Sequence, residues 1–289
     1  MSGRRINTTS HRNWIVSIFV LLAVFVLFTS VANHLSSASS TTYNTTAANK
    51  TSSKDAKAHS LSDSGGTSNV SNTIPTKGLS DSAANTVQSQ IGAKLTYVNG
   101  SYIIGNDIPV FDKRIPDTVG INAATLNSAG QLSSASALLN STIYDKTPRS
   151  GKVTYKPAGW QQRVVPGNIF GGYLYNRGHL IGYAFVGNLK GFDASENNRT
   201  NIMAETSWAN QAQGGAQGNG QNYFEGLVRN AVEKGETVKY EVKPLYVGSD
   251  KVPSAIEIEA QGSTVRFRAL VPNVQPGVNI NYATGLASN

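Results

Sequence analysis

Short runs of alternating hydrophobic and polar residues are concentrated in the last third of the chain. A period of two is typical of strands that bury one face and leave the other polar. The earlier runs are shorter and are interrupted by turn signals such as Asn99-Gly100. The pattern predicts strands at 95–104, 108–111, 174–180, 238–242, 256–258 and 265–271.

Two other segments have the spacing of amphipathic helices. Asn201 to Ala212 brings apolar positions near one face, and Gln221 to Lys234 does the same and stops before a glycine. The segment 123–139 is expected to be weakly helical or irregular. Because strands surround two helices and no internal repeat is visible, the sequence predicts one α+β domain over residues 86–289. We expect its sheet to be mostly antiparallel.

The N-terminal region has a different pattern. Residues 1–13 are polar and carry arginines, whereas residues 14–32 contain no charged side chain. The uncharged run approaches the roughly 20 residues that span a bilayer and exceeds the roughly 7–15 of a signal-peptide core. The positive-inside rule then predicts that residues 1–13 lie in the cytoplasm and that the domain after the apolar run lies outside the cell. We expect a retained single-pass anchor in the cell membrane, with a secreted form after cleavage at Ser30-Val31-Ala32 as the alternative.

Residues 33–85 are rich in Ser, Thr, Asn and Ala and have few large apolar side chains. Such a segment cannot bury enough apolar surface to offset the entropy lost on ordering, so it is predicted to be a disordered linker. The chain has no cysteine. An exported domain without disulfides must rely on its hydrophobic core, and about 200 residues are enough to form one.

The segment Tyr175 to Tyr183 contains the most specific chemical signal. His179 is the only histidine after His59, so any imidazole base in the predicted domain must be this residue. Arg177 lies two positions earlier and on a strand would share its face. Gly178 between them would let a ligand approach the backbone closely. A guanidinium and an imidazole directed at one point suit a phosphodiester.

The net charge of +8 divides evenly between the first 90 residues and the rest. This excess is too mild to indicate nucleic-acid binding by itself. One basic run without acidic residues is more suggestive, because aromatic residues interrupt it and could stack on bases. Lys156 and Arg163 are its candidate substrate contacts. The run consists of Lys146, Arg149, Lys152, Lys156 and Arg163, with Tyr155 and Trp160 among them.

Polar residues on the two predicted helices complete a candidate site. Asn201 would begin the first helix and Asn210 lies within it. Glu225 and Arg229 are four residues apart on the second helix and so share a face. Mg²⁺ prefers oxygen ligands, retains several waters and often binds few protein groups together with substrate phosphate. One carboxamide oxygen could therefore be enough to hold it.

The motif Asn176-Arg177-Gly178-His179 resembles the Asp-Arg-Gly-His motif of DNA/RNA non-specific endonucleases with the ββα-metal fold. The resemblance covers most of 95–289, and within the family the chain most resembles the membrane-bound DNA-entry nucleases of Gram-positive bacteria. Further similar blocks follow in the same order. They lie at 191–195, 201–202, 208–213, 221–225 and 270–275.

This resemblance implies roles for matching positions. His179 corresponds to the general base that activates water, and Asn210 to the direct Mg²⁺ ligand, with Mn²⁺ as an open alternative. The family cuts DNA and RNA with little sequence preference, leaves 5′-phosphate ends and uses no small-molecule cofactor. The remaining positions correspond to groups that hold the phosphate (Arg177 and Arg229) or orient the waters of the metal (Asn201 and Glu225).

One residue departs from the family motif: Asn176 replaces its usual Asp. An amide keeps a hydrogen bond but adds no negative charge, so any electrostatic help from this position is lost.

Two other classes of function remain open at this stage. A cell-wall glycosidase could use a carboxylate pair such as Asp193 and Glu205 and would need no metal. A surface protein could bind DNA without cutting it. EDTA separates the first of these from a nuclease, and the sequence leaves the oligomeric state undetermined.

Overall fold

The computed structural model describes residues 74–75, 78–147 and 151–289, all within the unit Gly65–Asn289. The predicted cytoplasmic segment, the membrane anchor and most of the linker lie outside these residues, as does Arg149. Across the described part of the chain, no helix is both long and apolar enough to cross a membrane.

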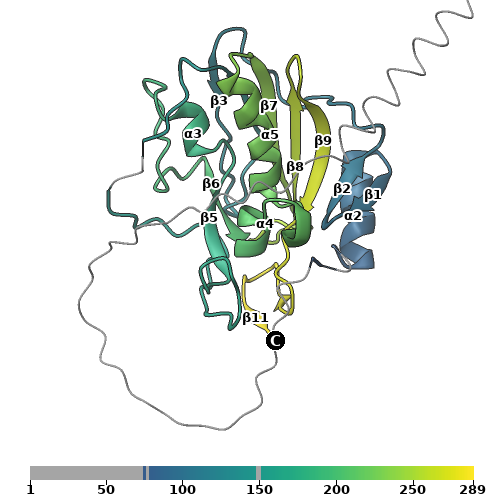
Figure 1. The fold of residues 1–289 in the computed structure, drawn as a ribbon. Helices are drawn as coiled ribbons and strands as arrows, with labels where there is room; N and C mark the ends of the chain where they lie inside the picture. Colours follow the sequence, from purple (N-terminus) through teal and green to yellow (C-terminus); the bar gives the residue numbers. More distant parts are fainter. Residues whose placement is uncertain (1–73, 76–77, 148–150) are drawn as a thin grey trace, which may run out of the picture. The chain divides into compact units, whose positions relative to one another are not determined.

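A seven-stranded sheet forms the centre of the fold (Figure 1). Every neighbouring pair in it is antiparallel, which confirms the predicted α+β class and sheet type. Its strands, in spatial order, are β1 (Leu95–Val98), β2 (Ser101–Ile104), β9 (Arg266–Pro272), β8 (Ala255–Gln261), β7 (Val238–Leu245), β4 (Ala135–Leu139) and β3 (Gly120–Asn122).

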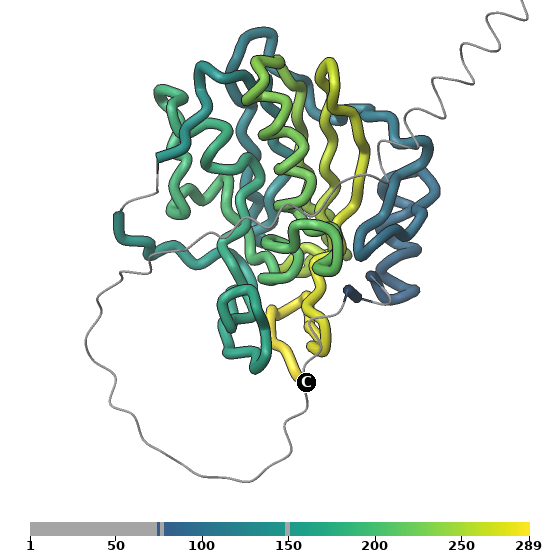
Figure 2. Tube along the Cα trace, viewed as in Figure 1, coloured from purple at the N-terminus to yellow at the C-terminus, as the bar shows by residue number. Residues whose placement is uncertain are grey.

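Two small antiparallel ribbons complete the strands. The first pairs β5 (Tyr175–His179) with β6 (Ile202–Thr206), and the second pairs β10 (Asn279–Ile280) with β11 (Ala287–Ser288). The tube in Figure 2 traces the loop of residues 163–174, which leads into β5. The helices are α2 (Asp81–Ile91), α3 (Tyr183–Val186), α4 (Ser207–Gln211), the 3₁₀ turn η1 (Gly215–Gln217) and α5 (Gln221–Glu233).

Helix α2 begins before the domain start expected at residue 86. Ser80 caps it by accepting a hydrogen bond from the Ala83 backbone N–H, and Val87 buries one face of the helix. Residues 81–85, which composition alone assigned to the linker, are therefore part of a helix.

Helix α5 packs against β7 and β8 and carries the predicted apolar face (Figure 1). Phe224, Val228 and Val232 are buried in one core with Tyr240 of the sheet. Leu227 of the same helix is exposed. The burial of this stripe fixes the rotation of α5 and so determines which of its polar residues face β5.

The helix predicted over 201–212 is wrong in its first half. Residues 202–206 form β6, which pairs residue by residue with β5, and only Ser207–Gln211 are helical. All residues of β6 are buried, so an apolar spacing that fits a helix equally fits a strand buried on both faces. Thr206 separates the two elements, because its side chain caps α4 at the Ala209 N–H.

The strand predicted at 108–111 is absent, whereas 123–139 is irregular as expected up to residue 134 and then forms a strand. The segment 108–111 is irregular rather than a strand, because the backbone N–H groups of Val110 and Phe111 bond to the carboxylate of Glu259 at 2.6 and 2.8 Å. The segment 123–139 ends in β4, whose pairing with β3 and β7 supplies the order that its own sequence lacks.

Candidate active site

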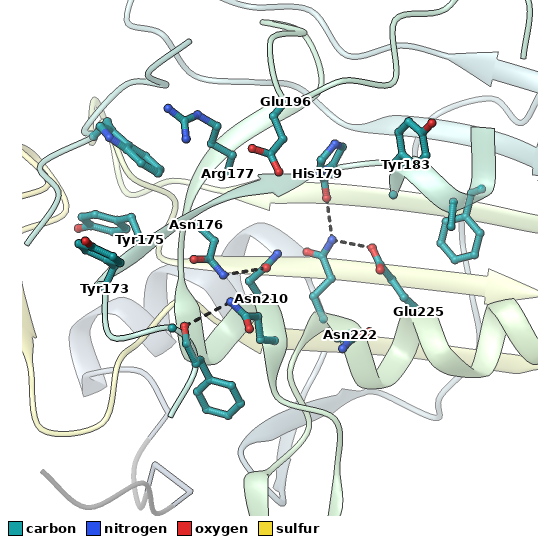
Figure 3. A pocket seen from close by; sticks show the side chains of 18 of the residues that line it. Tyr173, Tyr175, Asn176, Arg177, His179, Tyr183, Glu196, Asn210, Asn222 and Glu225 are labelled. Atoms are coloured by element: carbon teal, nitrogen blue, oxygen red, sulfur yellow. Dashed lines mark hydrogen bonds between the residues drawn. The ribbon is translucent and has the colours of Figure 1, made fainter. Parts of the chain in front are cut away.

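A cavity of about 740 Å³ lies where β5, α4 and α5 meet (Figure 3). It brings together predicted site residues from three elements, and β5 contributes most of one wall. The predicted residues that line it are Arg177, His179, Asn210, Glu225 and Arg229. Further polar lining comes from Asn176, Tyr183, Glu196, Gln221 and Asn222.

His179 ends β5 and is only 7% exposed. Its Nε2 lies 3.2 Å from the backbone carbonyl of Ala194. A carbonyl oxygen can only accept, so in this bond Nε2 carries the proton. In the neutral ring Nδ1 is then the basic nitrogen, and this carbonyl fixes the orientation of the imidazole.

Asn210 is oriented from both ends of its carboxamide, and Figure 3 shows its bond with Asn176. Asn176 Nδ2 donates to Asn210 Oδ1 at 3.1 Å, and Asn210 Nδ2 donates to Glu205 Oε2 at 2.9 Å. The amide oxygen of Asn210 is thereby turned toward Asn176, and it retains a second lone pair. The carboxamide oxygen of Asn210 is therefore held in place, as a neutral group that could bind a cation.

Glu205 is fully buried on β6, directly opposite Asn176 in the strand pair. Burial raises the pKa of Glu205 to about 8, the hydrogen bond from Asn210 lowers it, and the nearby Glu225 charge raises it further. Gly178 makes room for this side chain, because a Cβ at position 178 would lie 2.6 Å from the Cβ of Glu205. The sequence predicted that Gly178 lets a ligand approach the backbone, but in the structure it makes room for the Glu205 side chain.

A second network joins α5 to β5. Gln221 Nε2 donates to the His179 carbonyl at 2.6 Å and to Glu225 Oε1 at 3.0 Å. Glu225 Oε2 accepts from Arg229 Nη1 at 3.2 Å, so the predicted pair on one helix face forms. Asn222 Oδ1 holds the other guanidinium nitrogen at 2.6 Å. These bonds fix the carboxylate and the guanidinium at the cavity wall.

Arg177 is held by residues from the preceding loop. Its Nε donates to the Tyr155 carbonyl at 2.7 Å, and its guanidinium lies 4.7 Å from the centre of the Trp160 ring. Stacking on an aromatic ring and one hydrogen bond restrict the side chain while it still lines the cavity. Trp160, read from the sequence as part of a basic run, therefore supports Arg177.

Three predicted site residues do not reach the cavity. Asn201 is 1% exposed, and its carboxamide bonds to both the N–H and the carbonyl of Ile181, at 3.0 and 2.9 Å. Arg163 donates to Ala287 and Asn289 at 2.7 and 2.8 Å, so the returning C-terminus occupies it. Lys156 is exposed and is not among the lining residues.

The glycosidase pair is not assembled either. Asp193 is exposed and accepts a hydrogen bond from the Ser195 N–H within its own loop. Glu205 is buried beneath the cavity wall, and neither residue lines the cavity. Two carboxyl groups flanking a sugar ring are therefore not available at these positions.

The cavity suits a hard cation bound mainly through water. Its wall offers the Asn210 carboxamide and the carboxylates of Glu196 and Glu225, which are oxygen ligands. Within the described ranges, no group of three or more His, Cys, Asp and Glu side chains could hold a metal ion. A site with few protein ligands fits Mg²⁺ better than zinc, which favours nitrogen and sulfur ligands.

Comparisons with known proteins point to a family of nucleases. Residues 116–264 match a family model described as DNA/RNA non-specific endonuclease, and this segment contains every residue that lines the cavity. The crystal structure of NucA from Streptococcus agalactiae with magnesium ion bound is 34% identical, with a TM-score of 0.66. The match covers 72% of this chain and 96% of that one. NucA with no metal bound is 33% identical, with a TM-score of 0.66, over 75% and 99% of the two chains.

Proposed function

Because the chain belongs to the DNA/RNA non-specific endonuclease family, we propose that it is a Mg²⁺-dependent endonuclease that hydrolyses DNA and RNA without sequence preference. One observation carries this proposal: an oriented imidazole and an oriented carboxamide, His179 and Asn210, line a single cavity together with two arginines. The pair β5–β6 followed by α4 would be its ββα-metal core.

His179 is the proposed general base. Its Nδ1 accepts a proton from water as the water attacks phosphorus, while Nε2 remains bonded to the Ala194 carbonyl. Arg177 and Arg229 contribute positive charge where negative charge increases on the phosphate oxygens. The bond between phosphorus and the 3′-oxygen breaks, the departing oxygen takes a proton from solvent to become a 3′-hydroxyl, and the phosphate stays on the 5′ side of the next nucleotide.

Asn210 Oδ1 would hold Mg²⁺, and Glu225 would orient the waters around it. The ion, when bound, neutralises charge on the phosphate and on the departing oxygen. Asn201 is assigned a supporting role instead of a direct one, since it ties Ile181, just beyond His179, to the turn that begins β6.

Removal of divalent cations is expected to abolish cleavage. The full chain should relax and then degrade supercoiled plasmid in Mg²⁺, and excess EDTA should stop this completely because the cavity supplies too few charged ligands to bind metal irreversibly. Added Mg²⁺ should restore activity, and Mn²⁺ in its place tests the alternative ion. Digestion that continues unchanged in EDTA contradicts the proposed metal requirement.

The Asn176→Asp variant should be less stable than wild type without metal. It removes the donor to Asn210 Oδ1 and sets a carboxylate oxygen against that atom. The expected cost is about 1–3 kcal/mol, the usual penalty for an unsatisfied polar contact. A nearby cation would offset the repulsion, so the deficit in Tm should shrink in Mg²⁺. Thermal unfolding in EDTA and in Mg²⁺ measures this, and an equal deficit in both would argue against a metal beside Asn210.

The same proposal places the domain outside the cell, attached to the membrane through residues 14–32. The charge-free run at 14–32 and the arginines before it support this orientation. In intact cells the nuclease should stay with membranes after an alkaline wash and should be removed by external protease. Recovery of all activity in the culture medium would favour the secreted form.

A further inference from the structure

Aromatic residues gather at one end of the cavity. Trp160, Phe170, Tyr173 and Tyr175 all line it. Figure 3 shows Tyr173 and Tyr175 together on one side, while His179 and Glu225 lie toward the other. Along β5, Arg177 stands between Tyr175 and His179. A proposed phosphate-binding residue thus separates the aromatic end from the proposed base.

Three of these rings are already engaged within the protein. Tyr175 is 1% exposed, and its hydroxyl donates to the Gly285 carbonyl at 2.9 Å. Trp160 lies between Tyr175, at 6.2 Å between ring centres, and the Arg177 guanidinium. Phe170 is 8% exposed. None of the three offers a largely open ring face.

Tyr173 differs from them because 52% of it is exposed at the cavity wall. Its backbone is nevertheless firmly held: the carbonyl accepts from Ser207 Oγ at 2.7 Å and from Asn168 Nδ2 at 2.8 Å. Both donors are buried, and Tyr173 also forms an antiparallel bridge with Val164. A rigid backbone therefore presents an open aromatic ring to the cavity.

We propose that Tyr173 stacks on an unpaired base of the nucleotide flanking the cleaved phosphate. This inference rests on the proposed nuclease function and names a subsite within it. Every base has a π-face, so stacking suits an enzyme without sequence preference. A base within a duplex already stacks on its neighbours, and the subsite should therefore favour single strands.

The test compares two single strands of equal length and equal backbone charge. One is a short oligothymidylate, and the other carries an abasic tetrahydrofuran unit at every position. Their affinities are measured by fluorescence anisotropy with the full chain carrying His179→Ala, so that no cleavage occurs. Cleavage rates of both strands are then measured in the otherwise native chain.

In both backgrounds, Tyr173→Ala should weaken oligothymidylate binding or raise its KM about tenfold, within the usual contribution of base–aromatic stacking. Binding and cleavage of the abasic strand should stay unchanged. Tyr173→Phe keeps the ring and should behave like wild type. Val164→Ala is the matched control, because Val164 is the exposed bridge partner of Tyr173 and does not line the cavity.

An equal loss on both strands, or no loss on either, overturns the base-stacking subsite. These results are distinct from failure of the nuclease function itself. If the native chain cuts neither strand in Mg²⁺ and also fails on plasmid, the proposed function is wrong. If it cuts normally and Tyr173→Ala has no strand-dependent effect, only the subsite is wrong.

Discussion

Replacing His179 by alanine is expected to lower kcat for plasmid cleavage by about 10³-fold, near the middle of the range for loss of a general base. His179 is the only histidine in the part of the chain that the structure describes, so no second imidazole is available there to take over. KM should change much less, because Arg177 and Arg229 remain at the cavity wall. Initial rates of nicking at several DNA concentrations separate the two parameters.

The fold should survive this change. His179→Ala removes the hydrogen bond from the ring to the Ala194 carbonyl, which costs about 0.5–1.5 kcal/mol, while the backbone carbonyl of residue 179 can still accept from Gln221. Adding free imidazole to the variant should restore part of the rate if the cavity vacated by the ring admits it. A folded variant that cuts DNA at the native rate would remove His179 from the mechanism.

Asn210→Ala is expected to reduce cleavage by at least about 10²-fold and to raise the Mg²⁺ concentration needed for half-maximal rate. The variant loses the carboxamide oxygen at the cavity wall, which belongs to a group that hydrogen bonds orient at both ends. Because metal bound by few protein ligands depends strongly on each of them, raising Mg²⁺ should recover only part of the rate. A Mg²⁺ titration of the cleavage rate measures both effects.

Asn210→Ala should also destabilise the fold, and this effect must be separated from the loss of cleavage activity. Asn210→Ala leaves the buried Glu205 carboxyl without its donor, at a cost of about 1–3 kcal/mol. Gln211→Ala is a suitable control, because it removes the neighbouring amide of α4 at the same cavity. If Gln211→Ala shifts the Mg²⁺ dependence as far as Asn210→Ala does, the assignment of Asn210 as the ligand fails.

The sequence predicted the parts of the site that depend on local pattern. A strand is predicted at Leu174–Leu180, where β5 lies, and the apolar stripe of α5 places Glu225 and Arg229 on one face. Helix α5 carries a strong apolar period and ends just before Gly235, which is why its position could be predicted, whereas the burial of β5 does not alternate. The family resemblance then linked His179 to Asn210, which spacing alone could not do.

The rest depends on contacts between distant segments. Glu205 joins the site only because β5 and β6 pair in a register that sets it opposite Asn176 and against Gly178. Arg163 does not line the cavity, because it donates hydrogen bonds to Ala287 and Asn289 near the C-terminus. Neither the strand register nor the path of the C-terminus can be read from the local sequence.

We infer that one cation and one imidazole act on the same phosphate across the cavity between β5, α4 and α5. Anomalous diffraction from crystals of the folded unit grown in Mn²⁺ tests it most directly. A single strong peak is expected within coordination distance of Asn210 Oδ1, inside the cavity that His179 lines. A peak held by other residues, with none at Asn210, would contradict it.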